Sequence, residues 1–386
     1  MTAVNRREGP AFDAADHAHM ARALQLAARG LYGTDPNPRV GCVLVRDGRI
    51  VGEGWHARAG AAHAEAVALA AAGEAARGAT AYVTLEPCAH HGRTPPCCAA
   101  LVAAGVARVV CAVQDPDPRV NGRGIAALRE AGVRVESGLL AAEARALNPG
   151  FFSRLERGRP WLRIKLGMTL DGRTALANGA SRWITGEPAR RDVQRWRARS
   201  SAIVTGVGTV LADDPALTVR AEQWAGAVDE APPSDRQPLR VVLDSRLRTP
   251  PTARLLQGPG EALIVTTRAD AGRAAALRSE RVEVVTLPAD ADGRPRLADL
   301  MAVLAEGGIN EVLVESGPTL AGAFWRAGLV DELLLYVAPR LFGDSARGAF
   351  DLPAFAGVDE APALEYIDLR PVGRDLRILA RPLPGA

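Results

Sequence analysis

One stretch of the chain concentrates side chains that can bind a metal and move protons. It begins at His63, ends at Cys98, and reads HAEAVALAAAGEAARGATAYVTLEPCAHHGRTPPCC. It holds three of the six histidines and three of the five cysteines. A catalytic zinc ion takes three protein ligands and leaves a fourth position for water. His63, Cys88 and Cys97 supply such a set, so the sequence predicts a zinc site.

Glu65 lies two residues beyond His63, within reach of a metal-bound water without being a ligand itself. Zinc acidifies its water, and a neighbouring carboxylate can carry the proton from that water to a ring nitrogen and then to a leaving amine. Zinc deaminases show this pattern as H-x-E followed by P-C-x-x-C. This chain has His63-Ala-Glu65 and Pro87-Cys88, but eight residues separate Cys88 from Cys97. The pattern predicts hydrolytic deamination.

The alternative is a closed structural zinc site, which would need a fourth ligand such as Cys98, His90 or His91. The H-x-E spacing favours the catalytic interpretation. His56 reads as a histidine of a loop or strand end. Cys42 and Cys111 lie within predicted strands and read as small core residues.

The elements expected around this site alternate between helices and strands. Residues 14–30 have helical spacing, and residues 39–56 predict a β-hairpin that turns at Asp47-Gly48. Helices are expected after His63 and at Cys97, where a helix N-terminus would favour a thiolate. Alternation over about 140 residues indicates an α/β layer sandwich.

The rest of the chain must work with a different chemistry. All six histidines and all five cysteines precede residue 112, so a catalytic second half would rely on a bound cofactor. Its strand candidates alternate with helices and predict a second α/β domain. The only lysine is Lys165, at a position where a compact amine could be required.

Length and composition bound the remaining expectations. A chain of 386 residues favours two domains, and we expect a disordered leader at 1–14, a first domain at 15–158 and a second at 159–386. The net charge of +3 does not predict nucleic-acid binding. The absence of a long apolar run or a secretory signal, together with an odd number of cysteines, predicts a cytoplasmic protein with reduced thiols and no membrane association.

Longer motifs make the sequence specific. The segments HAEAVAL, ATAYVTLEPCAHHGRTPPCCAALVAAGVARVV and QDPDPRVNGRG resemble the bifunctional pyrimidine deaminase/reductase family of riboflavin biosynthesis. IKLGMTLDGRTA, SRWITG, TGVGTVLADDPALTVR and VESGPTLAGAF extend the resemblance from Ala15 to the C-terminus. It implies a cytidine-deaminase-like α/β/α sandwich with a mixed sheet, followed by an α/β domain like dihydrofolate reductase.

The resemblance also implies roles for individual residues of the first domain. His63, Cys88 and Cys97 would hold one zinc ion per chain, with Glu65 as the proton shuttle. Substrate contacts would come from Asn37, His90, Arg93 and Asp115. Position 117 departs from the family pattern, because many members have Asn where this chain has Asp117.

In the second domain the resemblance implies an NADPH site and a ribosyl-substrate site. NADPH contacts would come from Gly167, Trp183, Thr209, Asp213, Ser245, Gly317, Pro318, Thr319, Leu320, Ala321, Gly322 and Ala323. Contacts to the ribosyl substrate would come from Ser181, Arg197, Leu217, Arg220 and Glu315, with the two arginines as phosphate clamps. Lys165 would act catalytically, by opening or protonating the ribosyl ring before hydride delivery.

Together these expectations describe a two-step enzyme. It would deaminate 2,5-diamino-6-ribosylamino-4(3H)-pyrimidinone 5′-phosphate and then use NADPH to reduce the ribosyl chain to ribityl. The expected product is 5-amino-6-ribitylamino-2,4(1H,3H)-pyrimidinedione 5′-phosphate. A homo-oligomer acting on a small phosphorylated pyrimidine is expected. The alternatives are a nucleic-acid base deaminase, disfavoured by the aromatic content of only 4%, and a zinc-stabilised binding protein without turnover.

Overall fold

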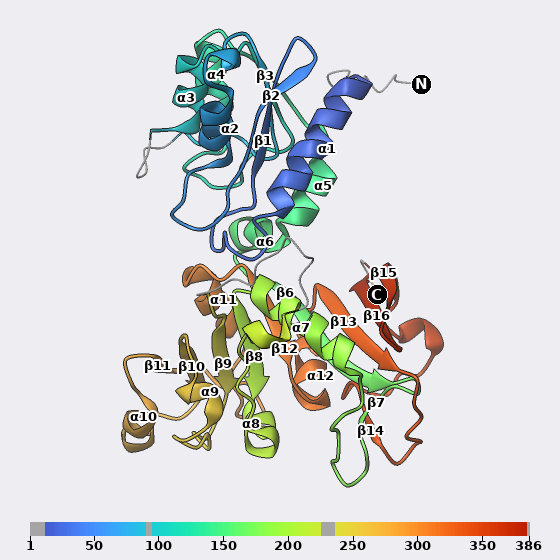
Figure 1. Ribbon diagram of the computed structural model, residues 1–386. Helices are drawn as coiled ribbons and strands as arrows, with labels where there is room; N and C mark the ends of the chain where they lie inside the picture. Colours follow the sequence, from blue (N-terminus) through green and yellow to red (C-terminus); the bar gives the residue numbers. More distant parts are fainter. Residues whose placement is uncertain (1–11, 90–94, 225–235, 384–386) are drawn as a thin grey trace, which may run out of the picture. The chain divides into compact units, whose positions relative to one another are not determined.

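The computed structural model describes residues 12–89, 95–224 and 236–383 (Figure 1). The chain divides into two compact units, Met1–Arg157 and Gly158–Ala386. Each unit is built on its own central sheet. Among the described residues, no helix combines the length and apolar composition that crossing a bilayer requires.

The first unit is a five-stranded mixed sheet in the order β2-β1-β3-β4-β5. β1 is antiparallel to β2 and β3, whereas β3, β4 and β5 are parallel. The strands are β1 Gly41–Arg46, β2 Arg49–Trp55, β3 Thr80–Val83, β4 Arg108–Cys111 and β5 Arg134–Ser137. The helices are α1 Ala14–Ala28, α2 Ala64–Ala72, α3 Cys97–Ala103, α4 Arg123–Glu130, α5 Ala141–Leu147 and α6 Pro149–Arg157, with a 3₁₀ turn at Gly73–Ala76.

Alternation along β1 places helices on both faces of this sheet. Cys42 and Leu44 belong to an apolar cluster with residues of α2, α3 and α4. Val43 and Val45 belong to a second cluster with residues of α1 and α5. Successive side chains of a strand point to opposite faces, so one strand contributes to two cores. The predicted α/β/α sandwich is confirmed.

Two local features follow directly from the residues present. The β1–β2 hairpin turns at Asp47 and Gly48, with φ of 50° and 73°, as the Asp-Gly pair predicts. Helix α1 begins after Asp13, which forms a capping box with Asp16. Phe12 packs against the cluster of α1 and α5, so this contact and the cap hold the last residues of the expected leader. Residues 1–11 lie outside the described part.

The second unit is a nine-stranded sheet in the order β11-β10-β9-β8-β12-β6-β13-β16-β15. Neighbouring strands from β11 to β13 are parallel, and β16 and β15 complete the sheet in antiparallel fashion. The strands are β6 Trp161–Thr169, β8 Ala202–Gly206, β9 Leu239–Leu243, β10 Ala262–Thr266, β11 Val282–Thr286, β12 Glu311–Glu315, β13 Glu332–Ala338, β15 Leu364–Val372 and β16 Asp375–Pro382. A small separate sheet pairs β7 Arg173–Ala175 with β14 Arg347–Gly348.

Helices cover both faces of the large sheet. Residues of α11 and α12 pack with one set of strand residues, and residues of α7 to α10 pack with others. On β12, Val312 and Val314 join the first set whereas Leu313 joins the second, as alternation requires. The helices are α7 Glu187–Arg199, α8 Val207–Asp213, α9 Arg254–Gln257, α10 Ala271–Leu277, α11 Leu297–Glu306 and α12 Pro318–Arg326. Short 3₁₀ turns lie at Ala221–Gln223 and Val358–Glu360.

The order of the strands brings distant segments together. β12 lies between β8 and β6, although more than 100 residues separate it from either along the chain. Since ligands of open α/β sheets bind at the carboxyl ends of parallel strands, β8, β12 and β6 define a candidate ligand edge. The predicted second α/β domain, in which strands alternate with helices, is confirmed. The β15–β16 pair was not predicted, because most of β15 is exposed and lacks a clear apolar alternation.

Candidate active sites

The three predicted zinc ligands come from three separate elements of the first unit. His63 is the N-cap of α2, Cys88 follows β3, and Cys97 is the first residue of α3. His63 Nδ1 lies 3.3 Å from Cys97 Sγ and 3.6 Å from Cys88 Sγ. One ligand atom of each residue falls within 4.8 Å of the others. Tetrahedral zinc bound at usual bond lengths separates nitrogen and sulfur ligands by about 3.5 Å, so this donor set fits the ion.

The electrostatics of the site also suit a cation. The Cys97 thiol, the His63 ring and the Cys97 backbone N–H donate hydrogen bonds to Cys88, which lowers the pKa of Cys88 to about 4 despite its burial. The hydrogen bond with Cys88 raises the pKa of His63. The interaction with Cys88 and burial raise the pKa of Cys97. A bound cation would replace the shared protons and allow both sulfurs to be thiolates.

Glu65 lies in the first turn of α2, only 3% exposed. Burial raises the pKa of its carboxyl group to about 7, opposed by smaller effects of a backbone N–H and of Cys97. A carboxyl group that titrates near neutrality can both take up and release a proton. The close packing of α2 on β2 fixes the position of Glu65. A Cβ on Gly54 of β2 would approach the carbonyl oxygen of Ala64 to 2.3 Å.

The fourth-ligand alternative is tested in part. Cys98 is buried in the apolar cluster of α2, α3 and α4, as are Cys42 and Cys111. Within the described ranges, the metal-binding group contains only His63, Cys88 and Cys97. The predicted substrate contacts His90 and Arg93, and the alternative ligand His91, lie outside the described residues.

Asn37 is connected to the metal-binding group through His56, a residue whose role the sequence did not reveal. Asn37 Nδ2 lies 3.1 Å from His56 Nε2, and His56 Nδ1 lies 3.0 Å from the carbonyl oxygen of Ala62. The carbonyl can only accept, so Nδ1 carries the proton and Nε2 accepts from the Asn37 amide. The His56 and His63 rings meet edge to face, with centroids 5.5 Å apart.

Asp115 follows β4, the parallel neighbour of β3, and is buried. Burial raises the pKa of its carboxyl group to about 6, although the backbone N–H of Asp117 donates to it at 2.8 Å. Asp117, the residue that departs from the family pattern, forms an ion pair with Arg119 at 2.6 Å. The carboxylate at position 117 is therefore compensated locally.

In the second unit two of the predicted ribosyl-substrate contacts, Arg197 and Glu315, meet at the carboxyl end of β12. Arg197 donates two hydrogen bonds to Glu315, at 2.6 and 3.0 Å, and a third to the carbonyl oxygen of Thr218 at 3.0 Å. Lys165 on β6 is the register partner of Glu315. Burial alone would raise the pKa of Glu315, but Arg197 and Lys165 lower it to about 2. Burial lowers the pKa of Lys165, and Glu315 opposes that shift.

Arg220, Leu217 and Ser181 lie on connecting segments. The Arg220 backbone N–H donates to Gln194 Oε1 at 3.0 Å, and burial and the charge of Arg197 lower the pKa of its guanidinium. Leu217 is buried with a φ of 50°. Ser181 is half-buried in the segment between β7 and α7.

The predicted NADPH contacts form one group of at least partly exposed residues and a smaller group inside α12. Gly167, Thr209, Asp213, Ser245, Gly317, Pro318, Thr319 and Leu320 lie on β6, on α8, after β9 and at the start of α12, and each is at least partly exposed. Trp183 is 63% exposed, with the Arg190 guanidinium 4.4 Å from its ring centroid, so it is not a core residue. The start of α12 differs from its interior: Ala321 is enclosed, and a Cβ on Gly322 would approach Asp351 O to 2.0 Å. Ala323 is partly buried one residue further along the helix.

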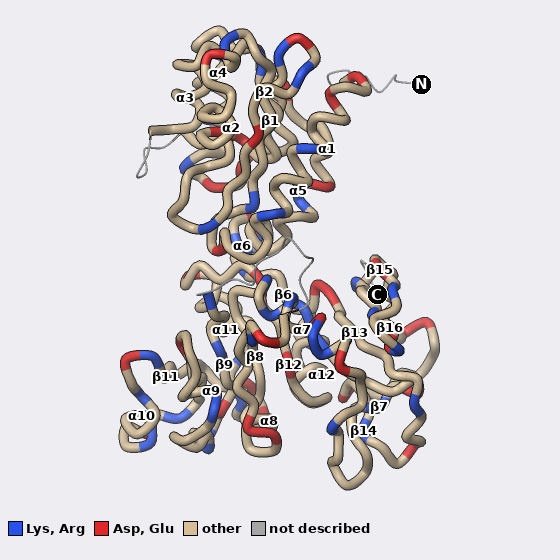
Figure 2. Tube along the Cα trace, in the orientation of Figure 1, with Lys and Arg blue, Asp and Glu red and all other residues tan. Residues whose placement is uncertain are grey.

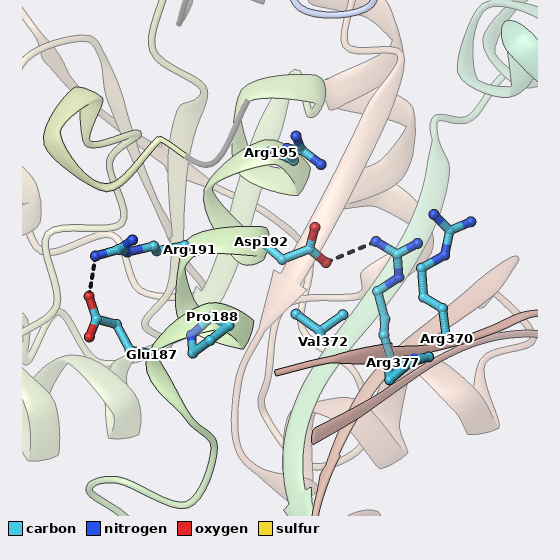
Figure 3. A pocket seen from close by; sticks show the side chains of 9 residues that line it. Glu187, Pro188, Arg191, Asp192, Arg195, Arg370, Val372 and Arg377 are labelled. Atoms are coloured by element: carbon cyan, nitrogen blue, oxygen red, sulfur yellow. Dashed lines mark hydrogen bonds and ion pairs between the residues drawn. The ribbon is translucent and has the colours of Figure 1, made fainter. Parts of the chain in front are cut away.

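A cavity of about 450 Å³ lies elsewhere in this unit, between α7 and the β15–β16 pair (Figure 3). Four arginines contribute to its wall, and three of them form ion pairs: Arg191 with Glu187, Arg370 with Asp368, and Arg377 with Asp192. Figure 3 shows Arg377 directed at Asp192 beside Arg370. None of the predicted site residues lines this cavity.

Comparisons with known proteins agree with this geometry. Residues 13–113 match the cytidine and deoxycytidylate deaminase zinc-binding region, and residues 160–378 match the RibD C-terminal domain. The chain is 52% identical over 363 residues to the riboflavin biosynthesis protein RibD of Escherichia coli, covering 94% of this chain and 98% of that protein. It is 46% identical to RibD of Haemophilus influenzae, covering 96% and 98%.

Solved structures show the same relationship. RibD of Acinetobacter baumannii matches with a TM-score of 0.86 and 44% identity, covering 96% of this chain and 99% of that one. A diaminohydroxyphosphoribosylaminopyrimidine deaminase/5-amino-6-(5-phosphoribosylamino)uracil reductase of Thermotoga maritima matches with a TM-score of 0.82 and 31% identity over the same shares. The predicted family, fold class and pair of activities are confirmed, with zinc and NADPH as cofactors. The chain belongs to the RibD family, the bifunctional deaminase/reductases of riboflavin biosynthesis.

Proposed function

We propose that this chain deaminates the diaminopyrimidine ribosyl phosphate at the His63, Cys88 and Cys97 centre and reduces the ribosyl chain of the product at the Lys165–Glu315 edge. The observation that carries the proposal is the set of three donors among the described residues. Three ligand atoms converge in the geometry of a tetrahedral site, with a buried carboxyl group of pKa about 7 beside them. Three protein ligands are the pattern of catalytic zinc.

In the deaminase step, Glu65 handles the protons. Zinc held by the three donors would supply a Lewis acid that makes water nucleophilic at neutral pH. Glu65 accepts a proton from the attacking water and passes protons to the ring nitrogen and to the departing amine. Water enters and ammonia leaves, so no redox partner is needed. The amine is lost as a neutral molecule because Glu65 returns the proton.

Substrate orientation falls to Asn37 and Asp115. His56 accepts a hydrogen bond from the Asn37 amide nitrogen, which leaves the Asn37 carbonyl oxygen for a ring N–H or amino group. Asp115 lies at the end of the strand next to β3 and supplies a second polar contact. His90 and Arg93 complete the set that we propose for the first site.

In the reductase step, bound NADPH would supply the hydride. We assign its phosphates to backbone N–H groups at the start of α12 and its other contacts to the partly exposed residues of β6 and α8. Arg197 and Arg220 bear the positive charge suited to the substrate phosphate. Lys165 provides a proton that opens or protonates the ribosyl ring before hydride delivery. The negative charge of Glu315 favours the protonated form of this lysine.

A small phosphorylated pyrimidine, with no nucleic acid or membrane partner, suits the charge distribution. Acidic and basic residues are interspersed along both units in Figure 2, whereas a nucleic-acid site concentrates basic residues. A cytoplasmic location and a homo-oligomeric assembly also belong to this proposal. None of the five cysteines forms a disulfide, which suits a reducing compartment.

A mass-resolved product assay tests the proposal. The zinc-loaded protein should convert the diaminopyrimidine ribosyl phosphate to the deaminated product alone, which gains two hydrogens only after NADPH is added. Glu65→Gln should retain zinc and lose deamination by at least about a hundredfold, since a general acid-base group contributes roughly 10²–10⁴. Lys165→Met should lose reduction and keep deamination. Deamination that persists in Glu65→Gln would refute the shuttle assignment.

A further inference from the structure

A buried carboxylate outside the predicted site organises the loop that carries Asp115. Glu86 lies at the end of the β3 segment, two residues before Cys88, and is 3% exposed. Its Oε2 accepts the backbone N–H groups of Asp115 at 3.1 Å and Gly122 at 2.9 Å. Its Oε1 accepts those of Gly124 at 2.9 Å and Ile125 at 3.1 Å. One side chain therefore receives four main-chain hydrogen bonds.

These four bonds join both ends of one loop. Asp115 lies four residues beyond the end of β4, and Gly122 is the N-cap of α4. A glycine N-cap has no side chain to accept the first N–H groups of its helix. Glu86 supplies that acceptor from another part of the chain, and its negative charge suits the helix N-terminus. The carboxylate thus closes the loop between residues 115 and 122.

Further contacts tie this loop to the metal-binding segment. The Glu86 backbone N–H donates to the carbonyl oxygen of Val113 at 2.9 Å. A Cβ on Gly124 would approach the carbonyl oxygen of Pro87 to 2.0 Å, so α4 starts directly against the residue that precedes Cys88. Across the loop, Gln114 donates to Asn121 at 2.7 Å. The position of Asp115 is therefore defined relative to Cys88 by short backbone links.

We infer that Glu86 is a positioning residue for deamination, which sets Asp115 against the substrate by clamping both ends of its loop. The inference rests on the substrate contact proposed above for Asp115. Among the described residues, the hydrogen bonds of the Glu86 side chain go to the backbone N–H groups of the 115–125 segment and not to the metal-binding side chains. Its effect reaches the reaction through the backbone of residues 115–125.

Glu86→Gln tests the clamp with little change of volume. An amide has one accepting oxygen, so it satisfies one pair of N–H groups and turns its own N–H₂ toward the other pair. We expect the KM for deamination to rise about tenfold or more with kcat little changed, because an unsatisfied buried pair loosens the loop but leaves Glu65 and the ligands in place. Zinc content should stay at one per chain. The retained zinc reports on the fold of the first unit. Reduction of the deaminated intermediate, which belongs to the second unit, should be unchanged.

Three comparisons make the test decisive. Glu53→Gln is the matched control, because Glu53 is a partly exposed carboxylate of the same unit that pairs with Arg22; it should leave the KM unchanged. Asp115→Asn should raise the KM, and the double variant with Glu86→Gln should raise it no more than the larger single change. Backbone hydrogen exchange should accelerate at residues 115–125 in Glu86→Gln.

The outcomes separate this inference from the proposed function. An unchanged KM in Glu86→Gln alongside a raised KM in Asp115→Asn overturns the clamp and keeps the substrate contact. Unchanged KM values in both variants refute the Asp115 contact. Loss of zinc from Glu86→Gln would show that the residue supports the ligand segment instead, and would overturn the inference. Unaltered exchange at residues 115–125 would also overturn it, even if the variant were inactive.

Discussion

Arg197 and Glu315, 118 positions apart in sequence, form a bidentate ion pair at the carboxyl end of β12 in the second unit, with N–O distances of 2.6 and 3.0 Å. Lys165 lies on the adjacent strand, in register with the same carboxylate. Glu315 therefore balances two cations at once. The ion pair fixes the orientation of Arg197, and the negative charge of Glu315 also favours the protonated form of Lys165.

Glu315→Gln should shift the pH dependence of reduction. The negative charge of Glu315 raises the pKa of Lys165 against the lowering effect of burial, so its removal lowers that pKa further. The protonated amine exists only below its pKa, so the alkaline limb of the kcat profile for reduction should move to lower pH. Rates of NADPH oxidation from pH 6 to 10 measure the shift, and deamination by the same variant is the control. An unmoved alkaline limb would contradict the role of Lys165.

Removal of the metal should separate the two activities. A chelator should abolish deamination, because the first unit has no other Lewis acid, while NADPH-dependent reduction of the deaminated intermediate continues. One equivalent of Zn²⁺ should restore deamination. Metal binding stabilises the folded state, so the thermal transition of the first unit should also fall on chelation. Parallel loss of both activities would contradict the division of chemistry between the units.

Asn37→Asp should weaken binding of the pyrimidine. The amide nitrogen donates to His56 Nε2, and a carboxylate has no donor for that nitrogen and places a negative charge beside it. Loss of one oriented hydrogen bond in a partly buried site predicts a KM increase of about tenfold or more. Steady-state deamination and zinc analysis check the expectation, with Gln25→Glu, an amide-to-carboxylate change at an exposed position of α1 in the same unit, as the matched control. An equal effect in both variants would argue for charge alone.

Asp16→Asn should reduce stability in a pH-dependent manner. Hydrogen bonds that Arg108 donates lower the pKa of Asp16 from 3.8 to about 2. Burial opposes this shift, and a hydrogen bond from the Tyr82 hydroxyl adds to it. A depressed carboxyl pKa stabilises the folded state above the unfolded pKa, and that contribution is lost as the pH falls through the folded pKa. The wild type should exceed the variant by on the order of 2 kcal/mol at pH 6, and the difference should shrink between pH 4 and 2.

Backbone hydrogen exchange of α1 at these pH values measures the Asp16 effect in the intact chain. Asp13 occupies the cap of the same helix and gives a comparison variant, Asp13→Asn, which keeps a capping side chain and should cost little. A stability difference that stays constant with pH would contradict the ion-pair explanation.

Much of the site could be predicted from local sequence because its chemistry depends on residue type and short spacing. His63 and Glu65 are two residues apart at a helix start, and Cys97 follows two prolines where a helix begins. The linear sequence is therefore enough to predict a set of metal ligands with a carboxylate beside it. The β1 hairpin follows in the same way from Asp47-Gly48 and strict alternation. Strand and helix types depend on periodicities that the chain displays locally.

Tertiary structure alone decided the contacts between distant segments. The clamp of Glu86 on Asp115 and Gly122, the amide orientation that His56 gives Asn37, and the Arg197–Glu315 pair each depend on which strands are neighbours. No local pattern encodes that β12 inserts between β8 and β6, because strand order follows from the burial of whole faces. Residue types and their spacing along the chain limit which atoms can do chemistry. The packing of the sheets decides which of those atoms meet, since hydrogen bonds and ion pairs act only over a few ångströms.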